Sequence, residues 1–216
     1  MSRVQHHPPE DILMDHAIGR LKRGPGLVME EHLCACPACR AEIERMEAVG
    51  GALLEDMAPA ETSPDALARI LARIEAPEPP RPSRPPPPAG LEGIDLSALL
   101  GDLPIGRRRW LAPGVWIRPL LSEPASGAST YLLRGGPGVK LLQHGHAGQE
   151  FTCVLKGAYR DQTGRYGPGD FQYAAEDLDH GPVAEPDGEC ICLISAEGPM
   201  QMHSLIGRIM QPFVGL

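Results

Sequence analysis

The chain has 216 residues and a formal net charge of −8, with 42% hydrophobic and 22% charged residues. This length suits one large domain or two small ones with a buried core. The acidic balance disfavours direct binding of nucleic acid, which needs a basic face for the phosphates. The chain opens without an apolar signal segment and contains no run long enough to cross a membrane. We therefore expect a cytoplasmic chain with reduced cysteines and a protein partner, without direct nucleic-acid or membrane contacts.

Residues 1–75 favour about four short helices. The first begins after Pro8-Pro9 and ends by Gly24-Pro25-Gly26, and the second covers about 27–33. The third begins at Pro37, a residue favoured in the first helical position, and ends near Gly50-Gly51 or slightly later. The fourth follows a capping Ser63, and its apolar residues recur at i, i+3, i+4 and i+7 on one face: Leu67, Ile70, Leu71 and Ile74.

A proline-rich run at 76–90 predicts a linker, because proline removes ladder donors and favours polyproline II. Beyond it, short apolar runs that begin near Val115, Thr130, Phe151 and Cys190 alternate with Gly, Pro and Asp turns. Many short strands at regular spacing indicate a sandwich or barrel. The expected organisation is an α plus all-β chain of two domains, with helices at 1–75, the linker at 76–90 and the β domain at 91–216.

The first metal-ligand pattern lies between the second and third predicted helices. Cys36 and Cys39 form a C-x-x-C pair at a helix start, and His32 lies four residues before Cys36. Structural zinc takes four such ligands in a tetrahedron, so a fourth must come from elsewhere. The nearest donors are His6 and His7, and His16 and Cys34 lie further away.

Two other interpretations of the C-x-x-C pair carry less weight. A redox pair would be expected within a thioredoxin-like βαβ pattern, which the surrounding sequence lacks. Packing as small hydrophobic residues does not explain the preceding histidine at helical spacing.

The second pattern lies in the β segment. The stretch from Gly138 to Gly157 matches the first cupin motif, G-x5-H-x-H-x3-E-x6-G, at every specified position. Its candidate ligands are His144, His146 and Glu150, and the two histidines share one strand face because side chains at i and i+2 point the same way. The second cupin motif is looser: His180 is the candidate fourth ligand, at a longer spacing than usual. The set suits Zn, Fe, Mn or Ni, and the alternative is a metal-free cupin with polar histidines in the barrel.

Three further cysteines lie in the predicted strands. Cys190 and Cys192 share a strand face, which makes them a candidate redox pair beside the metal site. Core packing in an apolar strand is the alternative that we favour for this pair, and more firmly for Cys153.

The H-x-x-x-C-x-x-C arrangement on a short helical segment resembles the zinc-containing anti-sigma family, in which a helical domain holds an extracytoplasmic-function sigma factor away from RNA polymerase. That resemblance carries over His32, Cys36 and Cys39, and its upstream histidine corresponds to His7, with His6 as the alternative. A zinc anti-sigma domain, a proline-rich tether and a cupin together resemble the ChrR family over nearly the whole chain. The fold implied is a zinc-binding helical bundle followed by a cupin, a double-stranded β-helix or jelly-roll barrel.

The resemblance implies a zinc-dependent anti-sigma factor that releases its sigma factor on a singlet-oxygen-like oxidative signal sensed through the cupin. On this interpretation the chain is not an enzyme and contains zinc in the helical domain and a divalent metal in the cupin. The alternative is a metal-dependent cupin oxygenase with an accessory helical domain, because cupins include both enzymes and sensors. A third interpretation is a regulator that responds to zinc depletion alone.

Overall fold

The computed structural model describes residues 4–77, 90, 91, 94, 103–123, 125, 127–141, 143–146, 148–175, 181–198 and 200–202. For His144, His146 and Met200–Met202 only the backbone is described. Two compact units divide the chain: one comprises residues 1–47 and 93–216, and the other residues 48–92. The expected linker falls in the second unit, and most of it lies outside the described residues, so the division at 1–75, 76–90 and 91–216 stays a prediction.

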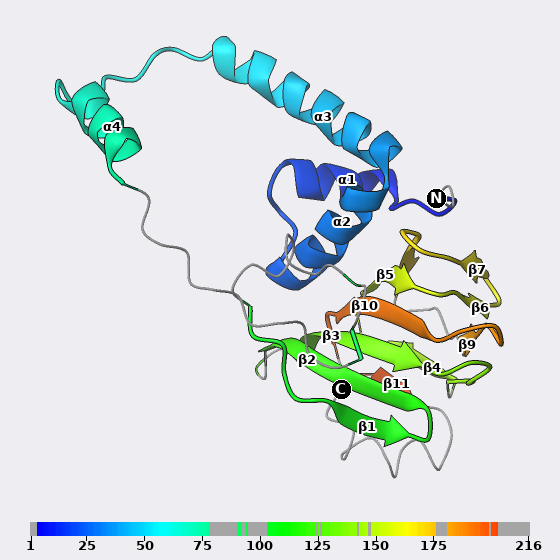
Figure 1. The fold of residues 1–216 in the computed structure, drawn as a ribbon. Coiled ribbons are helices and arrows are strands. Elements are labelled where there is room, and N and C mark those ends of the chain that lie inside the picture. Colours follow the sequence, from blue (N-terminus) through cyan, green and yellow to red (C-terminus); the bar gives the residue numbers. More distant parts are fainter. Residues whose placement is uncertain are drawn as a thin grey trace. The chain divides into compact units, whose positions relative to one another are not determined.

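Four helices are described, as expected from the sequence: α1 (Glu10–Ala17), α2 (Arg23–Ala35), α3 (Pro37–Glu55) and α4 (Ala66–Glu75) (Figure 1). Acidic Glu10 and Asp11 lie in the first turn of α1, where the helix dipole favours negative charge. Residues of α4 are all at least partly exposed, including its predicted apolar face. None of the described helices combines the length and the apolar character that a membrane span requires.

The predicted boundary between the first two helices is wrong. Helix α1 ends at Ala17, and Gly24-Pro25-Gly26 lies inside the first turn of α2 instead of stopping a helix. Proline is tolerated there because the first four amides of a helix have no intrahelical acceptor. Gly19, with φ +70°, provides the left-handed residue between the helices.

The β segment contains one large antiparallel sheet with the strand order β1-β2-β3-β10-β5-β8. Figure 1 shows β10 between β3 and β5 in this sheet. The members are β1 (Arg109–Ala112), β2 (Val115–Glu123), β3 (Ala128–Gly135), β10 (Cys190–Ala196), β5 (Glu150–Lys156) and β8 (Phe171–Ala174). All four predicted apolar runs lie in these strands, and Gly157, with φ +70°, ends β5 as the cupin motif requires.

Two smaller antiparallel sheets accompany the large one. One pairs β4 (His144–His146) with β11 (Met200–Met202), and the other has the order β7-β6-β9. The strands of the latter are β6 (Tyr159–Asp161), β7 (Gly164–Tyr166) and β9 (Val183–Ala184). A buried cluster joins this sheet to the large one: Ile117, Tyr131, Val154, Tyr159, Tyr166, Ala184, Cys190, Cys192 and Ile194. The β segment therefore has a jelly-roll core between two sheets.

The opposite face of the large sheet is covered by α2, which contacts β10, β5 and β3. Val28 and Met29 of this helix are fully buried. Every residue of β10 is buried, because Cys190, Cys192 and Ile194 face the jelly-roll core while the alternate residues face the helix side. Gly24 approaches the sheet closely: an added Cβ would meet Thr130 Oγ1 and would lie 2.5 Å from Ser195 Oγ.

Candidate metal centres and the family of the chain

The structure brings His7, His32, Cys36 and Cys39 together, with one ligand atom from each within 4.8 Å of all the others. His7 precedes α1, His32 lies in the last turn of α2, Cys36 follows that helix, and Cys39 is in the first turn of α3. The cluster is therefore built where three chain segments meet.

Distances within this cluster suit a tetrahedral zinc ion. The Nδ1 atom of His7 lies 3.4 Å from Cys36 Sγ and 3.3 Å from Cys39 Sγ. Zinc bonds of about 2.0–2.3 Å at tetrahedral angles place neighbouring ligand atoms roughly 3.3–3.8 Å apart. The amide of Cys39 also donates to Cys36 Sγ at 3.4 Å, a contact that orients the sulfur within the turn.

His32 is held in the tautomer that a metal ligand needs. Its Nδ1 lies 2.7 Å from the carbonyl oxygen of Gly169, so Nδ1 carries the proton and donates. Its Nε2 atom is buried and has no hydrogen-bond partner within the described part of the chain. Burial lowers the pKa of His32 to about 4, so the ring is neutral and Nε2 offers a lone pair. A buried imidazole nitrogen beside two thiols fits a zinc ion, which needs neutral histidine and thiolate ligands.

The structure distinguishes the four donors that the sequence offered as the fourth ligand, which are His6, His7, His16 and Cys34. The His6 ring lies 4.3 Å from the ring of Tyr166, and its Nδ1 is 3.5 Å from Asp170 Oδ2. Cys34 is exposed and His16 partly exposed, and neither belongs to the cluster found among the described residues. The geometry therefore selects His7 as the fourth candidate ligand.

The cupin ligands are described only in part. Glu150 lies at the start of β5 and is buried, and its Oε1 accepts a hydrogen bond of 3.4 Å from Thr152 Oγ1. His144 and His146 lie on β4, but their side chains lie outside the described residues, as does the whole of His180. The four-ligand cupin site thus stays a prediction of the motif.

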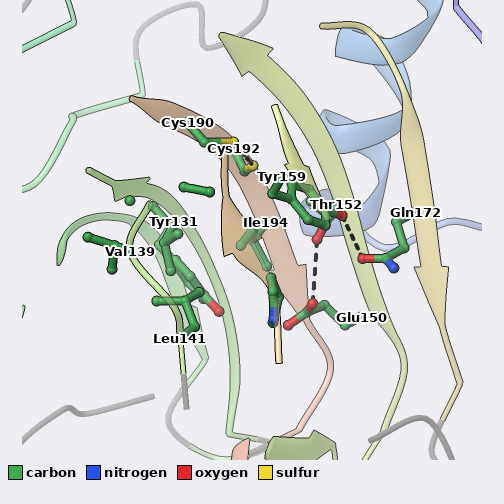
Figure 2. Close-up of a pocket in the computed structure, with 14 residues that line it drawn as sticks. Tyr131, Val139, Leu141, Glu150, Thr152, Tyr159, Gln172, Cys190, Cys192 and Ile194 are labelled. Atoms are coloured by element: carbon green, nitrogen blue, oxygen red, sulfur yellow. Dashed lines mark hydrogen bonds between the residues drawn. The ribbon is translucent and has the colours of Figure 1, made fainter. Parts of the chain in front are cut away.

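A small cavity of about 60 Å³ opens beside Glu150 inside the jelly roll. Figure 2 shows Glu150 and Thr152 on one wall and Cys190 and Cys192 on another, with Tyr131 between the labelled aliphatic residues. The Sγ atoms of the two cysteines are 3.7 Å apart. Contact with Cys190, together with burial, raises the pKa of Cys192 well above its usual range. Cys192 is therefore a thiol at neutral pH, and both cysteines line the same cavity as Glu150.

Known proteins resemble both parts of this arrangement. A curated relative, the anti-sigma-E factor ChrR of Cereibacter sphaeroides, is 36% identical over 214 residues, which cover 97% of this chain and 98% of the relative. The chain belongs to the ChrR family. The ChrR cupin-like domain matches residues 106–201, and the β segment is a cupin.

A solved structure adds a spatial match within the ChrR family. It is the crystal structure of Rhodobacter sphaeroides SigE in complex with the anti-sigma ChrR. The match has a TM-score of 0.72 at 37% identity, and it covers 89% of this chain and 99% of that chain. The ChrR resemblance stated from the motifs is thereby confirmed, and so is the order of a helical segment followed by a cupin.

Sequence analysis missed the role of the turn between β7 and β8. The carbonyl oxygen of Gly169 in this turn accepts a hydrogen bond from Nδ1 of His32. The oxygens of Asp170 accept hydrogen bonds from the backbone amides of Gln5, His6 and Gly167. No local sequence signal links this turn to the candidate ligand His32, 137 positions earlier in the chain.

Proposed function

We propose that this chain is a zinc-dependent anti-sigma factor. It sequesters an extracytoplasmic-function sigma factor and releases that factor on an oxidative, singlet-oxygen-like signal. The observation that carries the proposal is the cluster of His7, His32, Cys36 and Cys39 in a chain that aligns over 97% of its length with an anti-sigma relative. A sigma factor acts with RNA polymerase, so this role places the chain in the cytoplasm.

Zinc would be held by the two thiolates and by one nitrogen each of His7 and His32. Its chemistry there is structural: four protein ligands leave no open position for a substrate. These ligands would join the segment before α1 to the junction of α2 and α3 when zinc is bound. In so small a helical domain, zinc binding contributes on the order of 10 kcal/mol to the folding free energy. Removal of zinc is therefore expected to loosen the helices that would contact the sigma factor.

The surface proposed for sigma binding includes α4. Its apolar residues Leu67, Ile70, Leu71 and Ile74 form one helical face and are exposed by 48–73%. An apolar face of this kind is expected to be covered by another protein. A sigma factor that packs its own apolar surface on α4 fits the partner expected from the family.

The cupin is proposed as the sensor, with a divalent metal held by His144, His146, Glu150 and His180. Supporting observations are the cupin motif, the burial of Glu150 and the cavity beside it. Cys190 and Cys192 on the cavity wall are proposed as an accompanying redox pair. We propose no catalytic residue, and the domain organisation stays as expected: 1–75, a linker at 76–90 and 91–216.

The first test is capture of the sigma factor by the purified full chain from a lysate of the native host. Mass spectrometry should identify one extracytoplasmic-function sigma factor that is retained with zinc and lost after chelation. Cys36→Ser should abolish retention, whereas Cys34→Ser should keep it, because Cys34 is exposed and outside the cluster. Absence of a sigma factor in the zinc-loaded sample would contradict the proposal and direct attention to oxygenase assays of the cupin.

The sensor role has a separate test in a reconstituted transcription assay with that sigma factor. The double variant His144→Ala and Glu150→Gln should still inhibit transcription but should no longer release the sigma factor under singlet oxygen. Glu189→Gln is the control, because this carboxylate pairs with Arg134 and Lys156 and does not line the cavity. An intact response in the double variant would refute sensing through the cupin metal.

A further inference from the structure

The turn at Gly169 and Asp170, which joins β7 to β8 of the cupin, makes contacts at two places in and beside the cluster of His7, His32, Cys36 and Cys39. The first is the ring of His32, whose Nδ1 donates to the Gly169 carbonyl oxygen at 2.7 Å. This contact is buried and leaves Nε2 facing the other ligands. A histidine ligand is commonly oriented by such a hydrogen bond from its second nitrogen, which also makes the coordinating nitrogen more basic.

The second place is the segment just before His7. Asp170 Oδ1 accepts hydrogen bonds from the amides of Gln5 at 2.6 Å and His6 at 3.0 Å. The amide of Phe171 donates to the His6 carbonyl oxygen at 3.1 Å. β8 is an edge strand of the large sheet, so this hydrogen bond ties the segment before His7 to the edge of the sheet. The backbone on the N-terminal side of His7 is thereby fixed by the cupin.

The carboxylate of Asp170 suits this role. Burial acts to raise its pKa, but backbone amides of Gly167, Gln5 and His6 together hold the pKa below the usual value. The group is therefore ionised at neutral pH, and hydrogen bonds to a charged acceptor are stronger than those to a neutral one. One oxygen binds the cupin's own turn through Gly167, at 2.8 Å, and the other binds the segment before His7.

We propose that the Gly169–Asp170 turn is the outer coordination shell of the zinc centre, so that the cupin positions two of the four ligands, His32 and His7. The inference rests on the zinc site of the proposed function. By thermodynamic linkage, zinc bound to the helices stabilises their docking on the cupin, and a change in this turn weakens zinc binding. Zinc retention thus becomes a property of the full chain, although every ligand lies within residues 7–39.

Close packing at Gly169 provides a specific variant. Its φ is +86°, and an added Cβ would lie 2.8 Å from Cβ of Ala35 and 2.9 Å from Cγ2 of Val4, with no cupin atom among its neighbours within 4 Å. Gly169→Ala should therefore push the turn away from the helices. Gly138→Ala is the matched control, because Gly138 also has a positive φ, +66°, but an added Cβ there meets nothing within 4 Å.

The experiment uses cobalt(II) as the probe in the full chain. Only the helical centre has thiolate ligands, so thiolate-to-cobalt charge-transfer absorption reports on it and not on the nitrogen and oxygen ligands predicted for the cupin. A competing chelator is titrated against the wild type, Asp170→Ala, Gly169→Ala and Gly138→Ala. Loss of outer-shell contacts typically costs 10–100-fold in metal affinity. We expect a decrease of about that size for the first two variants and wild-type affinity for Gly138→Ala.

Thermal unfolding and the cobalt d–d bands are recorded in parallel. A changed d–d envelope in folded Gly169→Ala would show altered ligand geometry, which a general loss of cupin stability does not produce. Equal cobalt affinity in wild type, Asp170→Ala and Gly169→Ala would overturn the inference while leaving the zinc site in place. Equal losses in Gly169→Ala and Gly138→Ala would overturn it as well. Absence of the charge-transfer band in the wild type would instead refute the zinc site itself.

Discussion

The sulfur atoms of Cys190 and Cys192 lie 3.7 Å apart on the core face of β10, and both residues are buried. Cys36 and Cys39 of the helical segment are also buried, whereas Cys34 is exposed. Reactivity of a cysteine follows its access to solvent and its thiolate fraction. The six cysteines of this chain should therefore separate clearly in chemical modification.

In the zinc-loaded chain we expect iodoacetamide to modify Cys34 first and to leave Cys190 and Cys192 unmodified until the cupin unfolds. The pKa of Cys192 is raised, and its side chain is buried, so both factors oppose the reaction. Peptide mass spectrometry over a time course measures the order. Modification of Cys190 or Cys192 at the rate of Cys34 in the folded chain would contradict the buried position of β10. Cys153, buried and with a raised pKa, is the internal control.

The stability of the metal-free chain should fall as the pH decreases from about 6.5 to about 4. Burial lowers the pKa of His32 from 6.5 to about 4 in the folded chain. Below pH 6.5 the His32 ring therefore binds a proton in the unfolded chain but stays neutral in the folded chain. The contribution of His32 to the free energy of unfolding is complete above that pH and is lost toward pH 4. The loss amounts to about 3 kcal/mol at most, at 1.36 kcal/mol per pKa unit.

Urea unfolding of the metal-free chain at several pH values between 4 and 7.5 measures this dependence. His32→Asn removes the titrating ring, so its unfolding free energy should change less over the same interval. Equal slopes for the wild type and the variant would show that another group causes the loss. Zinc should steepen the dependence, because Cys39, whose pKa is raised to about 12, must lose its proton on binding.

The candidate metal ligands differ in how far the sequence could predict them. His32, Cys36 and Cys39 lie within eight positions, so the short junction between α2 and α3 brings them together. The choice between His6 and His7 depended on contacts of His6 with Tyr166 and Asp170, more than 150 positions away. Adjacent residues in an irregular segment carry no periodicity that could have decided between them.

The boundary between α1 and α2 and the contact of Gly169 with His32 escaped prediction for related reasons. Gly24-Pro25-Gly26 has the composition of a helix stop, but the close approach of α2 to the sheet at Ser195 requires glycine there, and first-turn proline is tolerated. Gly169, with φ +86°, lies in the turn between β7 and β8. Its contact with His32 depends on docking of α2, which no local pattern encodes. The roles of Gly24 and Gly169 thus depend on tertiary contacts and not on the local sequence.

Substitution of Gly24 should destabilise the chain, whereas the same substitution at Gly26 should not. An alanine at 24 would meet the hydroxyls of Thr130 and Ser195, which are buried and joined by a 3.1 Å hydrogen bond. Breaking that bond leaves a buried polar group unsatisfied, at a cost of about 1–3 kcal/mol. Gly26→Ala meets nothing within 4 Å in the same helix, and its greater helix propensity should stabilise by up to about 1 kcal/mol.

Chemical denaturation of the two variants with zinc bound gives both values from midpoints at equal slopes. Similar effects at the two positions would mean that α2 does not pack on β3 and β10 in solution. A loss at Gly24 with unchanged zinc affinity would place the defect in docking of the helix and not in the metal ligands.

The exposed apolar face of α4 should be required for sigma binding and dispensable for folding. Ile70 and Leu71 are exposed by 56% and 48%, so Ile70→Glu with Leu71→Glu removes little buried area in the free chain. In the complex, the two carboxylates would be buried against an apolar partner surface at a cost of several kcal/mol. Because 1.4 kcal/mol corresponds to a factor of ten, we expect at least a 100-fold weaker affinity for the sigma factor.

Binding titrations with the captured sigma factor measure this loss, and Arg69→Glu is the control. Arg69 lies on the opposite face of α4, about 200° around the helix from Leu67, and its side chain is 72% exposed. The control carries the same new charge on the same helix, so it should bind nearly as the wild type does. If both variants bind like the wild type, α4 does not contact the sigma factor. If both lose binding equally, added negative charge and not the apolar face governs the interaction.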